Sequence, residues 1–170
     1  MDIVRFSERL MGMKDEVWLR HANPWSVWTR VLTPLPLLAV AIWSRAWVGG
    51  WAWGAMAFVL VWIWLNPRVF PQPKNFDSWS AQGVLGERVW LRHRDTVSVH
   101  HKRIAKALAV GSGLGLVPFA YGLWKFDIGL TCLGIVMISG GKMWFVDRMV
   151  WVWRDFQRGG GSLSDLETAR

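Results

Sequence analysis

Residues 17–21 read VWLRH, and the same five letters return at residues 89–93. Each copy is followed by two long apolar stretches. The similarity continues around the string in residues of matching character: Asp15 with Glu87, Asn23 with Asp95, Ser26 with Ser98, Val27 with Val99 and Arg30 with Lys102. An internal repeat indicates the architecture before any single residue does. This one predicts two similar halves, each a basic amphipathic entry segment followed by an apolar hairpin.

The composition indicates a membrane protein. The chain is 52% hydrophobic and contains 15 Trp but one Tyr. Soluble domains are usually less apolar, and Trp is favoured at membrane–water interfaces. The formal net charge is +8. Because the charges lie between apolar segments, we expect membrane lipids with anionic headgroups as partners, and no nucleic acid.

Four apolar segments are visible, at about residues 31–48, 49–65, 104–124 and 128–146. A helix of roughly 20 residues crosses a hydrocarbon core. Lipid offers no hydrogen-bond partners, so the segments must be helical. We therefore predict an all-α polytopic membrane protein with four transmembrane helices in two parallel-repeat hairpins. The expected parts are an amphipathic segment (1–30), hairpin 1 (31–65), a connector with the repeated entry segment (66–103), hairpin 2 (104–146) and a C-terminal tail (147–170).

Several helix boundaries are also readable. Asn23-Pro24 fits an N-cap followed by proline at the first helical position, and the nearby Pro34 and Pro36 should kink this helix. Lys125-Phe126-Asp127 is the expected turn of the second hairpin. The run Gly159-Gly160-Gly161 predicts the start of a flexible tail.

The basic residues predict the orientation. Only Arg45 and Lys125 lie in the two hairpin turns. The other basic residues lie in the N-terminal segment, in the connector, at the start of the third apolar segment (Lys106) and in the C-terminal end or its approach. Positively charged loops stay inside the cell. We therefore expect a multi-pass protein of the bacterial inner membrane, with both termini and the connector cytoplasmic.

The repeated string itself suggests anchoring at the interface. Tryptophan can bury its ring at the acyl boundary while arginine binds lipid phosphate. The more specific alternative to general anchoring is a site that binds one phospholipid headgroup. The residues concerned are Trp18, Arg20, His21, Trp90, Arg92 and His93.

The four histidines, His21, His93, His100 and His101, all fall on the expected cytoplasmic side. Since His21 and His93 are repeat equivalents, a pseudo-two-fold axis would bring them together. Paired imidazoles can hold a metal or a haem iron. The competing interpretation is that each histidine simply lies beside arginine in a headgroup-facing segment.

Glycines spaced four residues apart suggest close helix packing in the membrane. Two pairs have this spacing, Gly50 with Gly54 and Gly111 with Gly115. Residues 111–115 resemble a phosphate-binding loop by their letters, but they follow no strand, so packing is the better interpretation.

Four strings are distinctive: RHANPWS (20–26), NPRVFP (66–71), LGERVW (85–90) and GKMWFVDRMVW (141–151). Together they resemble a family of uncharacterised small bacterial integral membrane proteins, classed as a domain of unknown function. The resemblance covers roughly residues 17–155. It implies a bacterial inner-membrane protein and brings no catalytic residues.

Three functions fit these features. The first is a non-catalytic scaffold, such as an accessory subunit of a larger photosynthetic or respiratory complex, bound to other membrane protein subunits. Its tryptophan-rich surface would also suit contact with a pigment or a quinone. The second is a histidine-ligated metal or haem redox protein, and the third is a phospholipid-headgroup-binding protein. The absence of a convincing reactive cluster in the sequence favours the non-catalytic interpretation.

Overall fold

The computed structural model describes residues 15–168, and within that range every regular element is a helix. This confirms the all-α prediction. The elements are α2 (Asp15–His21), α3 (Pro24–Leu32), α4 (Pro34–Trp43), α5 (Arg45–Val48), the 3₁₀ helix η1 (Gly49–Trp51), α6 (Ala52–Val69), α7 (Trp79–Arg92), α8 (Val99–Leu114), α9 (Leu116–Lys125), α10 (Ile128–Arg158) and α11 (Leu163–Thr168).

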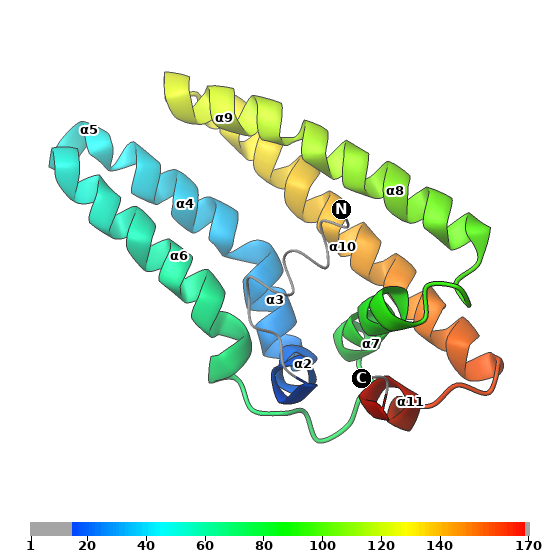
Figure 1. Ribbon diagram of the computed structural model, residues 1–170. Coiled ribbons are helices and arrows are strands. Elements are labelled where there is room, and N and C mark those ends of the chain that lie inside the picture. Colours follow the sequence, from blue (N-terminus) through cyan, green and yellow to red (C-terminus); the bar gives the residue numbers. More distant parts are fainter. Residues whose placement is uncertain (1–14, 169–170) are drawn as a thin grey trace.

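Within the described range, three helical stretches are long and apolar enough to cross a membrane: Pro24–Val69, Val99–Lys125 and Ile128–Arg158. The first has 46 residues and would be about 69 Å long if it were straight. Instead it turns back at Gly49, whose φ of 54° suits glycine. As a result α4 packs along α6. Figure 1 shows this hairpin beside a second one, with both turns at the same end of the molecule.

The caps and breaks of the first hairpin agree with the sequence. The Asn23 side chain accepts a hydrogen bond from the Trp25 N–H at 2.9 Å, and Pro24 opens α3, which confirms the predicted N-cap. A break at Thr33 separates α3 from α4, and Pro34 begins the new helix. The second helix of this hairpin, α6, extends past residue 65 to Val69 with Pro67 in its last turn.

The second hairpin joins α8 and α9 to α10. Phe126 adopts the left-handed conformation (φ 58°) at the end of α9, and Asp127 caps α10 by accepting from the Leu130 N–H at 2.9 Å. This confirms the predicted turn at residues 125–127. Helix α10 continues unbroken for 31 residues to Arg158, well beyond the expected end of the span at residue 146.

The entry helices lie across the bases of the hairpins. In each half the entry helix packs against the returning helix of its own hairpin, α2 against α6 and α7 against α10. The two contacts differ greatly in extent, since α7 has by far the larger one and is buried along most of its length. This helix, predicted as an amphipathic surface segment, is the central element of the fold.

Two glycines let α7 approach α10 closely. A Cβ atom at Gly86 would lie 1.8 Å from the Met149 carbonyl oxygen, and one at Gly83 would lie 2.4 Å from the Val146 side chain. No side chain fits at such distances, so backbone touches backbone at this crossing. The contact is of the small-residue type that membrane helices use.

The glycines singled out from the sequence behave differently. A Cβ at Gly50, Gly54 or Gly111 would meet nothing within 4 Å, so packing within this chain is the wrong interpretation for these three. They lie on exposed faces of their helices. Gly115 is closely packed as predicted, because its Cβ would come 2.8 Å from that of Met137.

Three clusters of buried side chains hold the helices together. Trp18 and Val27 pack with Ala81, Val84 and Leu91, which joins the first half to α7. A second cluster surrounds Trp90, Met149 and Trp153. A third joins the hairpins near their turns, with Ala39 of α4 against Phe119 and Leu123 of α9.

The C-terminal segment is folded onto the bundle rather than hanging free. Gly160, with a φ of 90°, redirects the chain after α10, and the short helix α11 follows. Leu166 of α11 is fully buried in the cluster around Trp90, and the Arg92 guanidinium donates to its carbonyl oxygen. The expected flexible tail is therefore corrected for residues up to 168, because an apolar anchor holds it.

Candidate functional site

The repeated tryptophans are core residues. Trp18 is 6% exposed and Trp90 is 8% exposed, each inside a different cluster of the protein. Their rings therefore face other helices, which corrects the expectation that they lie at the acyl boundary. Arg92 is committed to the carbonyl of Leu166, and Arg20 is half-buried and has an interaction of its own. The amphipathic pattern that suggested lipid anchoring arises instead from packing within the chain.

The four histidines occupy separate environments. His21 lies against Trp18 and Arg30, whereas the His93 ring lies 5.3 Å from that of Phe156. His100 is exposed, and His101 Nε2 lies 3.0 Å from the Asp155 carboxylate. Among residues 15–168, no three His, Cys, Asp or Glu side chains converge in a way that would hold a metal ion. The structure therefore does not bring His21 and His93 together as the metal hypothesis requires.

His21 belongs to a group of charged residues where the two halves meet, the polar junction, which consists of His21, Arg30, Glu87 and Lys142. The Arg30 guanidinium lies 2.5 Å from His21 Nδ1. Because guanidinium can only donate, this ring nitrogen must accept, which requires a neutral imidazole. On the other side, Lys142 Nζ donates to Glu87 Oε1 at 2.7 Å. Four helices thus contribute to the junction: α2, α3, α7 and α10.

Burial lowers the pKa of His21 well below its ordinary value of 6.5, and the charges of Arg30 and Lys142 lower it further. Glu87 is the carboxylate of the junction, and its negative charge attracts the Arg30 guanidinium. Protonating His21 would therefore place a third cation beside a single carboxylate. The junction is stable with a neutral imidazole and resists an imidazolium.

This arrangement predicts a loss of stability in acid. The pKa of His21 is lower in the folded protein than in the unfolded chain, so the unfolded chain binds more protons below about pH 6.5. The free energy of unfolding should fall as pH drops below that value, by up to ~1.4 kcal/mol per pH unit. Thermal unfolding in detergent between pH 7.5 and 5 measures it. His21→Asn keeps an acceptor for Arg30 but cannot titrate, so its curve should be flatter. Parallel curves for the two proteins would show that other groups cause the loss.

A buried network of neutral polar groups lies beside the junction, between α3 and α6. Ser26 Oγ donates to Asn66 Oδ1 at 3.0 Å, and Asn66 Nδ2 donates to Thr29 Oγ1 at 2.7 Å. Asn66 is 1% exposed. Buried polar groups are tolerated when they are hydrogen-bonded, and these are. The network holds the base of the first hairpin and offers no reactive group.

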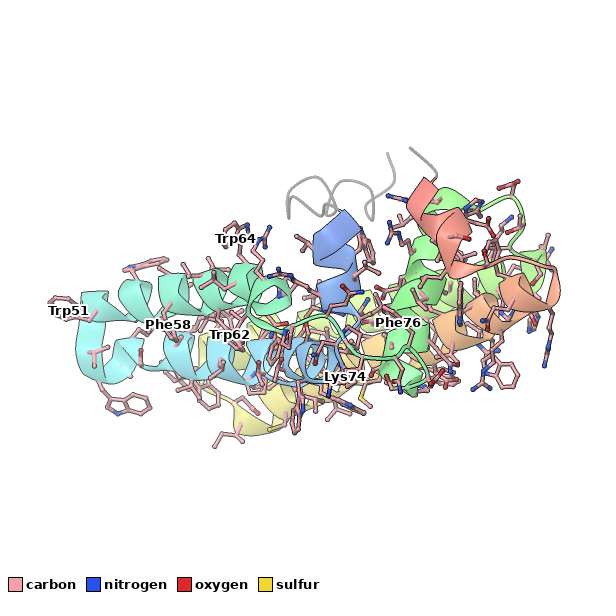
Figure 2. All side chains as sticks on the ribbon, turned by 90° about the horizontal axis from the view of Figure 1, so that it is seen from below. Trp51, Phe58, Trp62, Trp64, Lys74 and Phe76 are labelled. Carbon is pink, nitrogen blue, oxygen red and sulfur yellow. The ribbon has the colours of Figure 1, made fainter. Side chains whose placement is uncertain are left out.

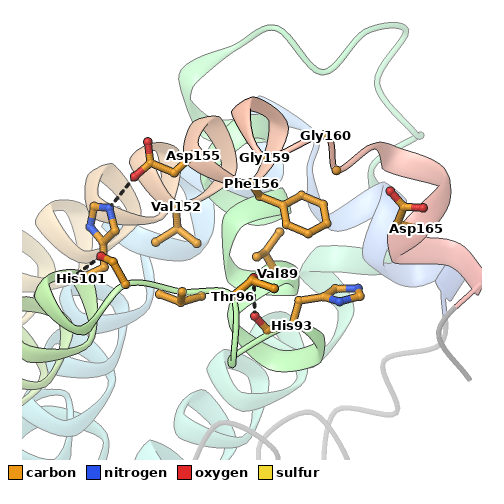
Figure 3. Close-up of a pocket in the computed structure, with 13 residues that line it drawn as sticks. Val89, His93, Thr96, His101, Val152, Asp155, Phe156, Gly159, Gly160 and Asp165 are labelled. Atoms are coloured by element: carbon orange, nitrogen blue, oxygen red, sulfur yellow. Dashed lines mark hydrogen bonds and ion pairs between the residues drawn. The ribbon is translucent and has the colours of Figure 1, made fainter.

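A cavity of about 630 Å³ lies at the same end of the molecule, between α7, α8, α10 and α11. Its apolar wall comes from Val89, Val97, Val152 and Phe156, and its polar groups from Thr96, Ser98, His93, His101, Asp155 and Asp165. Figure 3 shows His93 and Asp165 on one side of this space, and His101 bonded to Asp155 on the other. The volume is within the usual range for small-molecule sites.

The chain as a whole matches one known family. A family model matches residues 4–169, nearly the whole chain. The chain belongs to the family of unknown function DUF6653. This confirms the resemblance to an uncharacterised family. No curated protein and no solved structure matches the chain. Family membership therefore assigns no reaction, and the site must be interpreted from its own chemistry.

Sequence reasoning identified His21, His93 and His101 but missed the acidic and basic residues around them, including the Glu87–Lys142 pair of the polar junction. Glu87 and Lys142 are 55 residues apart in the chain, so no local pattern links them. One signal was available, because a lysine flanked by glycine and methionine in an apolar run needs a counter-charge. Asp155 and Asp165 carried no comparable signal, since acidic residues near a terminus are common.

Proposed function

We propose that this chain is a non-catalytic scaffold of the bacterial inner membrane and an accessory subunit of a larger energy-transducing complex. The observation that carries the proposal is the exposure of its apolar helices. Within the three candidate spans only 11%, 22% and 17% of the most apolar windows is buried. An apolar surface of this extent is not stable in water, so lipid or other protein subunits must cover it.

Four crossings follow from the hairpins under this proposal. The first hairpin crosses outward through α3 and α4 and back through α6, and the second crosses through α8 and α9 and back through α10. Tryptophan side chains support the assignment. Trp47, Trp51, Trp53 and Trp124 are strongly exposed near the two turns, and Trp51 projects from the tip of its hairpin (Figure 2). Exposed tryptophans at this level match an aromatic belt at the far interface.

The position of the basic segments supports the proposed orientation in the membrane. Entry helices α2 and α7, the segment between α6 and α7 and helix α11 all lie at the end opposite the turns (Figure 1). Lys74 in this segment is exposed. Under the positive-inside rule this end is cytoplasmic. The scaffold proposal also accounts for the polar junction, whose role is then to fix the two hairpins relative to each other.

Cysteine labelling tests the topology. The only native cysteine is Cys132, so Cys132→Ser provides the background. Trp51→Cys and Lys125→Cys should react with an impermeant thiol reagent from the periplasmic side of cells with a permeabilised outer membrane. Lys74→Cys and Gln157→Cys should react only after the inner membrane is opened. The reverse pattern would overturn the orientation, and protection of only one hairpin turn would overturn the four crossings.

The accessory role has its own test. Gentle extraction from native membranes, followed by native gel electrophoresis, should place the protein in a band much larger than its own 19.5 kDa together with other subunits. Mass spectrometry and an absorption spectrum of that band would identify the partners and any pigment. A protein that always migrates as a monomer or as a homo-oligomer would contradict the accessory role and leave the scaffold to act alone.

A further inference from the structure

The charge of the cavity between α7, α8, α10 and α11 is opposite to that of the protein. The chain has 20 Lys and Arg against 12 Asp and Glu. Yet the charged side chains among the described residues that line this cavity are both acidic, Asp155 and Asp165, and no Lys or Arg lines it. Arg158, outside the lining, pairs with one oxygen of Asp155 at 3.3 Å, so Asp165 carries most of the unbalanced negative charge. Hydrogen bonds from the Ser162 hydroxyl and backbone N–H lower the pKa of Asp165, which keeps its carboxylate ionised.

The histidines of the cavity have unused hydrogen-bonding capacity. His101 is 8% exposed, and its Nε2 is hydrogen-bonded to the Asp155 carboxylate. A carboxylate only accepts, so Nε2 carries a proton, and Nδ1 is an acceptor whenever the ring carries no second proton. This Nδ1 is buried without a hydrogen-bond partner, as is Nε2 of His93. Buried polar atoms of this kind are usually satisfied in a working protein.

Beside two carboxylates, and with ring nitrogens that can accept, an added donor completes the cavity better than an added acceptor. A phosphate or a carboxylate would meet two acidic groups, and an apolar molecule would leave the imidazoles unsatisfied. A primary ammonium group has three N–H donors, no acceptor and a positive charge. Phe156, whose ring packs against those of His93 and Trp153, adds an apolar wall that suits the carbon chain of an amine.

We propose that this cavity binds a primary alkylammonium group. Asp165 and Asp155 supply the opposing charge, the free imidazole nitrogens of His93 and His101 accept N–H donors, and Phe156 contacts the methylene groups. Helix α11 completes the site, since it carries Asp165 to the cavity after the turn at Gly160. This site is independent of the scaffold role.

Two sources can present this chemistry. One is the ethanolamine headgroup of a phospholipid, because the cavity lies at the end of the bundle where the membrane interface is expected. The other is a free amine in the cytoplasm. The two share the ammonium group and differ in the phosphate and acyl chains attached to it.

Calorimetric titration of the full-length protein in an uncharged detergent tests the proposal. Ethanolamine and dihexanoyl phosphatidylethanolamine are the probes, with dihexanoyl phosphatidylglycerol and inorganic phosphate as anionic comparisons. We expect saturable binding of the two amines and none of the anions. Tighter binding of the phospholipid would identify a headgroup site, and equal affinities would identify a free amine. Tetramethylammonium, which has the charge without the donors, should bind at least about fivefold more weakly than ethanolamine.

Isosteric variants connect the binding to the cavity. Asp155→Asn and Asp165→Asn keep the shape and the acceptor oxygen but remove the charge, so each should weaken ethanolamine binding by about fivefold or more. Asp95→Asn, an exposed acid in the adjoining loop that does not line the cavity, is the matched control. The variants' thermal unfolding shows whether α11 remains folded. Absence of amine binding, binding of phosphate instead, or equal effects of Asp95→Asn and Asp165→Asn would each overturn the proposal.

Discussion

Replacing Gly86 with alanine is expected to prevent stable folding, although the change adds a single carbon atom. The added Cβ would lie 1.8 Å from the carbonyl oxygen of Met149 and 2.5 Å from its carbonyl carbon. Because these are backbone atoms, no rotamer change can make room, and α7 would have to separate from α10. Overpacking of a flexible core costs about 1–3 kcal/mol. The contact between α7 and α10 is the largest between any two helices of the fold. We therefore expect the free energy of unfolding to fall by more than ~4 kcal/mol.

Gly140→Ala is the matched control. Gly140 also lies in the interior of a long helix, but nothing lies within 4 Å of its Cβ position. Alanine is the better helix former there, by up to ~1 kcal/mol. Thermal unfolding by size-exclusion chromatography in detergent should thus show a fall for Gly86→Ala and no fall for Gly140→Ala. Equal melting temperatures for Gly86→Ala and the wild type would mean that α7 does not cross α10 as described.

The second large effect is expected at the repeated tryptophans. Trp90→Ala would remove most of a large side chain from the cluster that contains Met149, Trp153 and Leu166. Truncation of a buried tryptophan costs roughly 3–5 kcal/mol. Trp18→Ala should have a similar cost, because it empties the cluster that joins α2 and α3 to α7. Both losses should appear as lower melting temperatures of the purified variants.

Trp51→Ala provides the contrast, since this side chain is 85% exposed at the hairpin turn. Its removal should leave the melting temperature in detergent nearly unchanged. Trp90→Phe should restore part of the stability, as an aromatic ring still fills much of the space. If Trp51→Ala were as harmful as Trp90→Ala, the stability would depend on contact with lipid or detergent rather than on internal packing.

Local chemistry explains why much of the fold was predictable. The Asn23 cap, the break before Pro34 and the turn at Phe126 each depend on residues close together in the sequence. Apolar length then predicted long helices, because a helix that crosses lipid needs about 20 mainly apolar residues. These features carry their own physical signal and need no knowledge of the partner helix.

Contacts between distant segments were not predictable in the same way. Four-residue spacing identified Gly111, which has open space around it, and overlooked Gly86, which touches Met149. Four-residue spacing of glycines indicates that one face of a helix carries no bulky side chains. It does not indicate which neighbouring helix that face contacts. Similarly, Trp18 and Trp90 lie in segments that look interfacial, and only the tertiary fold shows that other helices cover them. The Glu87–Lys142 pair of the polar junction and the His101–Asp155 pair of the cavity are long-range in the same sense.

Arg45 at the first hairpin turn has a consequence for the order of assembly. Its guanidinium donates to the Leu123 carbonyl oxygen at 2.7 Å and lies 4.2 Å from the ring centre of Phe126, so it caps the end of α9 in the other hairpin. Leu123 is 78 residues further along the chain. During synthesis the first hairpin is therefore complete while its arginine has only the Ile42 carbonyl oxygen of its own hairpin as an acceptor, at 3.0 Å. The second hairpin, synthesised later, supplies the carbonyl groups of Leu123 and Trp124, so this bond can form only after both hairpins are present.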